Sequence, residues 1–136
     1  MKNDAEVECW VCVDPPKSTA QMKGVSWRGR RFFEKPDAKS ARLSLEDAFR
    51  RHAPAEPMVG PLIVSTSWVF SNIQADKGLL VPHSQKPDVD NMLKAFLDVL
   101  TKLGYWVDDK QIVMMTVEKW RGPQTGIALA VSKFAQ

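Results

Sequence analysis

The chain has 136 residues, a length that suits one hydrophobic core and is short for two independent domains. Hydrophobic residues make up 44% of it and no apolar run approaches about eighteen residues, which argues against a membrane protein. The polar start, Met1 to Glu8, lacks the features of a secretory signal, so we expect a cytoplasmic protein. The net charge of +3 permits nucleic acid as a partner without requiring it.

The first half of the chain predicts two strands with a helix between them. Residues 5–13 suit a strand that stops before Pro15 and Pro16, and residues 17–39, rich in Lys, Arg, Gly and Ser, suggest a long irregular basic loop. Apolar residues at helical spacing after Ser44 predict a helix over much of residues 41–52, ended by Pro54. The β-branched and aromatic residues of 59–70 predict the second strand, and a polar loop should follow it.

The second half carries the clearest helix. Apolar residues recur at three-four spacing from near Asp90 to Leu103, and Gly104 stands where a left-handed C-terminal cap is needed. Residues 112–120 and 127–134 suit two further strands, and the turn-forming residues 121–126 between them predict a hairpin. The expected fold is α/β or α+β: one domain over residues 1–136, with a mixed sheet of about four strands, two helices packed on it and a long basic loop.

Two carboxylates, Asp88 and Asp90, stand where the loop turns into this helix. Capping of the free backbone N–H groups would explain one aspartate, but two of them together with a nearby lysine are less easily explained. Lys94 lies one helical turn beyond Asp90, where it could assist chemistry or form an ordinary surface ion pair.

A second acidic pair, Asp108 and Asp109, follows the helix. The helix is about 20 Å long, and five extended residues after Gly104 span about 17 Å. If the chain doubles back, Asp109 can therefore reach Asp88 and Asp90; the alternative is that the pair only marks a turn. Three carboxylates without a nearby histidine or cysteine favour Mg²⁺, with Mn²⁺ as a second choice, over zinc. Such a metal ion at a phosphodiester would activate water and offset the charge on the leaving oxygen.

The motif Asp88-x-Asp90-Asn91-x-x-Lys94, followed by an apolar helix and then by residues 104–113, resembles the signature of the RusA family of crossover junction endodeoxyribonucleases. The resemblance is close from residue 86 to about residue 119. It implies that Asp88, Asp90 and Asp109 bind the metal ion and that Lys94 completes the catalytic set. It also implies a homodimer, without a small-molecule cofactor, that resolves four-way DNA junctions by paired symmetric cuts in recombination and repair. A bacterial or phage-infected cell would be the setting.

The basic residues suggest where DNA binds. Some family members have an arginine-rich run before the first catalytic aspartate, whereas this chain has His83-Ser84-Gln85-Lys86. We expect phosphate contacts from a basic set: Lys17, Lys23, Arg28, Arg30, Arg31, Lys35 and Lys86. No role is assigned to the histidines, to Glu118 or to Lys119. The competing hypotheses are a less selective nuclease with the same site, and a junction-binding or architectural DNA protein that does not cleave.

Overall fold

The computed structural model describes residues 6–16, 23–25, 32–34, 36–71 and 79–134. The strands are β1 (Val7–Val11), β2 (Lys23–Val25), β3 (Phe32–Glu34), β4 (Leu62–Ser71), β5 (Val81–Pro82), β6 (Ile112–Gly122) and β7 (Gly126–Lys133). The helices are α1 (Pro36–Arg50), α2 (Val89–Lys102) and the short 3₁₀ helix η3 (Asp109–Gln111).

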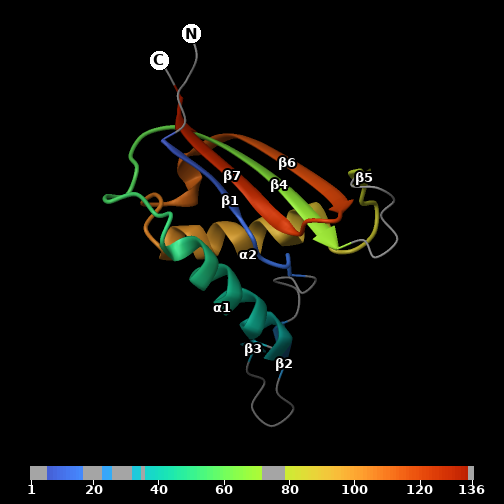
Figure 1. The fold of residues 1–136 in the computed structure, drawn as a ribbon. Helices are drawn as coiled ribbons and strands as arrows, with labels where there is room; N and C mark the ends of the chain where they lie inside the picture. The colour runs from blue at the N-terminus through green and yellow to red at the C-terminus, as the bar shows by residue number, and fades with distance from the viewer. Residues whose placement is uncertain (1–5, 17–22, 26–31, 35, 72–78, 135–136) are drawn as a thin grey trace.

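The molecule has two layers, a mixed sheet and a pair of helices on one of its faces (Figure 1). The five strands of the sheet stand in the order β1-β7-β4-β6-β5, and β4 pairs parallel with β6 and antiparallel with β7. The predicted α+β class is confirmed. The sheet has five strands rather than about four, because the two-residue β5 adds to the edge of β6.

The region expected to be one irregular loop contains regular structure in its described part. Strands β2 and β3 pair antiparallel with one another, from Lys23 opposite Glu34 to Val25 opposite Phe32. Helix α1 begins at Pro36 rather than near residue 41. Proline suits the first helical position because its fixed φ fits a helix and its missing N–H has no partner there in any case. The irregular-loop prediction was therefore wrong for these segments.

The core lies between the sheet and the helices. Along β4 the side chains of Leu62, Val64, Thr66 and Trp68 are buried, while the residues between them are only partly so. Trp68 meets Phe96 of α2 edge to face, with 5.1 Å between ring centroids, and this fixes which face of β4 the helix covers. Alternation with period two thus directs every second side chain of the central strand into the core.

The predicted hairpin between residues 112–120 and 127–134 is wrong. Strand β4 lies between β6 and β7, with Ser71 opposite Gly122 on one side and Val69 opposite Gly126 on the other. The three-residue connection therefore passes the end of β4, and a Cβ added to Gly122 would lie 3.2 Å from the side chain of Val69. The turn-forming residues marked the reversal correctly, but local chemistry does not reveal which strand fills the space between two others.

Helix α2 ends as predicted. Gly104 has φ +84°, and the N–H groups of Gly104 and Tyr105 donate to the carbonyls of Thr101 and Leu100, the two bonds of a Schellman cap. The cap turns the chain so that Tyr105 and Trp106 enter the core. No helix in the described part of the chain is long and apolar enough to cross a membrane.

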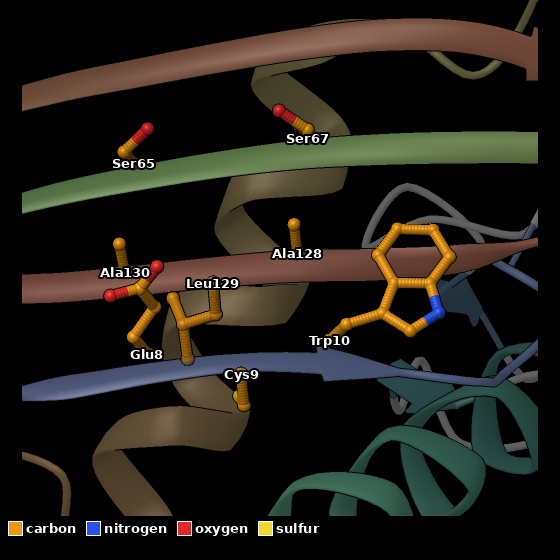
Figure 2. Close-up of a pocket in the computed structure, with 8 residues that line it drawn as sticks. All are labelled: Glu8, Cys9, Trp10, Ser65, Ser67, Ala128, Leu129 and Ala130. Carbon is orange, nitrogen blue, oxygen red and sulfur yellow. The ribbon is translucent and has the colours of Figure 1, made fainter.

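The other face of the sheet carries a shallow hollow of about 510 Å³, drawn in Figure 2. Short side chains of β4 and β7 form its floor, among them Ser65, Ser67 and Ala128, and Trp10 of β1 borders it. The indole of Trp10 lies over Gly126, where an added Cβ would come within 2.3 Å of the ring. This hollow lies on the face of the sheet that the helices leave open.

Candidate active site

The first predicted carboxylate, Asp88, is the N-cap residue of α2. Its backbone is extended, with φ −71° and ψ 146°, and its carbonyl accepts the first helical hydrogen bond, from the N–H of Met92 at 3.0 Å. Its side chain, however, accepts no capping hydrogen bond. Capping therefore does not occupy this carboxylate, which is exposed together with that of Asp90 in the first turn.

Lys94 is exposed on the same helix, one turn after Asp90. The ion pairs among the described residues are Arg42–Glu46, Lys102–Glu46 and Arg50–Asp47, and none of them involves Lys94. The alternative that Lys94 only forms a surface ion pair with Asp90 therefore has no support in the described part of the chain. Its ammonium is therefore not neutralised by an ion pair with any of the described residues.

The second acidic pair divides into two roles. Asp108 caps η3: its carboxylate accepts from the N–H of Lys110 at 2.9 Å, and its own N–H donates to the side chain of Gln111 at 2.9 Å. Asp109 is the first residue of η3 and is exposed. Partial burial raises the pKa of Asp109, and the negative charges of Asp108 and Asp98 raise it further. The turn-marking alternative thus accounts for Asp108 but not for Asp109.

Asp109 does not lie with Asp88 and Asp90 in this chain. Asp98 is one of the charges that raise the pKa of Asp109, and it lies two helical turns, about 12 Å, beyond Asp90 along α2. Figure 1 shows α2 beginning beneath the arrowheads of β4 and β6 and ending at the opposite side of the sheet. Across the described ranges, no three His, Cys, Asp or Glu side chains are grouped closely enough to hold a metal ion. The role of Asp109 as a third ligand stays a prediction.

The loop that leads into α2 is held by two cations of β6. Lys119 donates from Nζ to the carbonyl oxygens of Gln85 and Pro87, both at 2.6 Å. Arg121 donates from Nε to Nδ1 of His83 at 2.9 Å and from Nη2 to Oε1 of Gln85 at 2.6 Å. Sequence reasoning assigned no role to Lys119 or His83. The available signal was the spacing of Lys119 and Arg121, which places both on one face of a strand.

Most of the predicted DNA contacts cannot be compared with the structure. Lys17, Arg28, Arg30, Arg31 and Lys35 lie outside the described residues, and for Lys23 only the backbone of β2 is described. Lys86 is described: it is exposed, two residues before Asp88, and its carbonyl bonds to the ring of His83 at 3.1 Å. One residue of the basic set is therefore exposed in the loop that leads to Asp88.

Two exposed carboxylates that cap nothing are a suitable donor pair for Mg²⁺, which is usually held by one or two carboxylates while waters fill its other positions. The hollow of Figure 2 is a poorer candidate for phosphate chemistry. Among the described residues that line the hollow, Glu8 alone is charged, and the hollow lies on the sheet face away from α2. The N-terminal end of α2 is thus the stronger candidate for an active site on DNA.

Comparison with known proteins points the same way. The chain matches the family model of Endodeoxyribonuclease RusA over residues 14–132. It is similar to a crossover junction endodeoxyribonuclease of Lactococcus phage r1t, with 27% identity over 98% of this chain and 99% of the relative. Shorter matches, 46% identical over 39 residues, are found with crossover junction endodeoxyribonucleases of Escherichia coli K12 and Enterobacteria phage 82. They cover 29% of this chain and 32% of those proteins.

Proposed function

Because the chain belongs to the RusA family of endodeoxyribonucleases, we propose that it resolves four-way DNA junctions by metal-dependent cleavage. The full-length similarity to a crossover junction endodeoxyribonuclease supports the junction as substrate. The observation that supports the metal-dependent part is the exposed pair Asp88 and Asp90 at the start of α2, where the Asp88 side chain makes no capping bond. Lys94 follows one turn later and forms no ion pair with the described residues. These are the residues that the sequence motif singles out.

In this proposal Asp88 and Asp90 hold Mg²⁺ or Mn²⁺, hard cations that oxygen ligands favour. The bound ion would polarise the phosphodiester and promote formation of hydroxide from water. Lys94 stabilises negative charge that develops on the phosphate, since its ammonium is not bound in an ion pair of the described residues. Lys86 contacts a neighbouring phosphate and orients the strand to be cut.

The wider parts of the proposal concern assembly and setting. A four-way junction has approximate two-fold symmetry, so a homodimer would present one site to each of two strands. Paired symmetric cuts of this kind serve DNA recombination and repair. Relatives from phages and from Escherichia coli support the cytoplasm of a bacterial or phage-infected cell as the setting.

The experiment compares Asp90→Asn with the unaltered protein on a labelled four-way junction and a matched linear duplex, with Mg²⁺ or with a chelator. Mutation of a residue that only supports a metal ligand typically lowers metal affinity or activity by about 10–100-fold. Loss of a ligand itself should therefore reduce the cutting rate by more than about 100-fold. Junction binding in chelator should stay within a factor of about three, because the basic residues are unchanged. Asp47→Asn, the same change at an exposed position of α1, is the control and should cut normally.

Several results would change the proposal. Full cutting by Asp90→Asn would remove Asp90 from the mechanism. Metal-independent junction binding without cutting by the unaltered protein would favour the architectural alternative, and equal cutting of the linear duplex would favour the less selective nuclease. Asp109→Asn belongs in the same series: an equal loss would support its role as a ligand despite its place at the far end of α2.

A further inference from the structure

The loop of residues 83–87 is attached to the sheet by side chains of β6, immediately before the predicted metal-binding carboxylate. Lys119 bonds to the carbonyls of Gln85 and Pro87, and Arg121 bonds to the side chains of His83 and Gln85. We propose that Lys119 is a positioning residue for Asp88, which acts on the metal site through the backbone rather than by touching substrate. This inference rests on the proposed function.

Lys119 reaches the loop because of its place in the sheet. It pairs with Trp68 in the parallel register of β4 and β6, and Trp68 faces α2, so Lys119 points to the helix side of the sheet. It is only partly exposed, unlike Lys94. An ammonium there needs partners, and the two carbonyl oxygens at 2.6 Å provide them as charge-assisted hydrogen bonds.

The bond to Pro87 has the most direct effect on Asp88. The Pro87 carbonyl belongs to the peptide unit that contains the Asp88 nitrogen, and that unit is planar. Fixing its oxygen therefore fixes the direction in which the chain enters α2 and from which the Asp88 side chain projects. No capping hydrogen bond orients the Asp88 carboxylate. The backbone bond from Lys119 thus contributes directly to its position.

His83 and Arg121 secure the other end of the loop. The Arg121 guanidinium donates to Nδ1 of His83, so that nitrogen carries no proton and Nε2 donates to the Lys86 carbonyl at 3.1 Å. The ring is buried against Phe70, with 4.8 Å between ring centroids. Successive carbonyls at residues 85, 86 and 87 therefore all accept hydrogen bonds from this network. Such a network can hold a metal ligand near its binding geometry before the ion arrives.

The test compares Lys119→Met with Lys119→Arg and with the control Lys133→Met, an equal charge change at an exposed position of β7. Thermal unfolding establishes that each variant is folded. Three further properties are measured: backbone amide exchange of residues 83–89 in metal-free protein, Mn²⁺ affinity by calorimetry, and kcat and KM on a four-way junction.

The expected result for Lys119→Met is faster amide exchange in residues 83–89, Mn²⁺ binding weakened about 10–100-fold and a similar drop in kcat. KM for the junction should stay within about threefold, since the Lys119 ammonium is bonded to two loop carbonyls rather than presented to DNA. Lys119→Arg should restore most of the loss, because a guanidinium can also donate to two carbonyls. A merely structural lysine would alter thermal stability without this separation of kcat from KM.

Other outcomes have definite meanings. Unchanged Mn²⁺ affinity and kcat in folded Lys119→Met would overturn the inference, and if that variant does not fold, Lys119→Gln takes its place. If the unaltered protein neither binds Mn²⁺ nor cuts DNA, the proposed function fails. Amide exchange would still report on the loop in that case: faster exchange in Lys119→Met would support the positioning of Asp88, and unchanged exchange would refute it.

Discussion

Replacing Tyr105 with phenylalanine tests how α1 is attached to the turn after α2. The Tyr105 ring is fully buried, and its hydroxyl donates to the carbonyl oxygen of Phe49 at 2.5 Å. Burial raises the pKa of Tyr105, so the hydroxyl remains protonated and able to donate throughout the neutral range. The substitution removes one oxygen and leaves the ring packing unchanged.

The expected loss follows from what remains at the Phe49 carbonyl. A buried hydrogen bond contributes about 0.5–1.5 kcal/mol, and a carbonyl left without any partner costs about 1–3 kcal/mol. The Phe49 carbonyl still accepts from the N–H of His52 at 3.2 Å, so it is not left without a partner. The loss should therefore be about 1 kcal/mol, which corresponds to a fall in Tm of roughly 3–5 °C for a domain of this size.

Urea unfolding followed by fluorescence and circular dichroism measures the free energy of unfolding of Tyr105→Phe against the unaltered chain. The slope of that free energy against urea concentration should not change, because the same surface is exposed on unfolding. No measurable loss would mean that the hydroxyl bond contributes nothing to stability. A loss above about 3 kcal/mol would mean that the His52 bond does not replace it.

Two further predictions use pKa shifts. Hydrogen bonds from Lys102 and Arg42 lower the pKa of the buried Glu46 carboxyl, so its stabilisation is complete above about pH 4.5 and is lost as pH falls through the lower folded value. Glu46→Gln should lower the free energy of unfolding by about 1–2 kcal/mol at pH 7, a modest loss because the Lys102 partner is exposed to solvent. The difference from the unaltered protein should shrink in acid. The raised pKa of Asp109 has the opposite effect on stability, because the ionised group destabilises the fold. Asp109→Asn should therefore raise Tm at neutral pH without metal.

The stabilities of Glu46→Gln and Asp109→Asn are measured by unfolding across a pH series in chelator. Asp47→Asn serves as the control for loss of an exposed carboxylate. A pH-independent effect of Glu46→Gln would assign it to packing rather than to charge. A lower Tm for Asp109→Asn would contradict the unfavourable environment deduced for that carboxylate.

The elements that sequence predicted well are those whose signals are local. The three-four spacing from Asp90 to Leu103 and the glycine after it specify α2 and its cap, because helix hydrogen bonds join residues four apart. Strand β4 was also predicted, since its branched and aromatic residues suit a packed sheet. Helix α1 was recognised from its C-terminal half, but its start at Pro36 was missed.

What sequence did not predict depends on distant pairing. The insertion of β4 between β6 and β7 requires the pairing of residue 62 with residues 112 and 133, and no local pattern encodes that choice. The same holds for Lys119, whose partners at Gln85 and Pro87 are more than thirty positions earlier in the chain. Asp88, Asp90 and Lys94 were identified because they share one short motif, whereas the path from α2 to Asp109 depends on how Tyr105 and Trp106 pack.

The order of the sheet also governs when the protein can be completed during synthesis. Among the described strands, β1 pairs with β7 alone, and Val11 lies opposite Ile127, 116 residues later in the chain. At translation rates of about 5–20 residues per second, β1 waits for its partner for roughly 6–23 s. During that interval an unpaired strand emerges from the ribosome while β7 does not yet exist. A protein with this topology can pair β1 only after β7 has been synthesised.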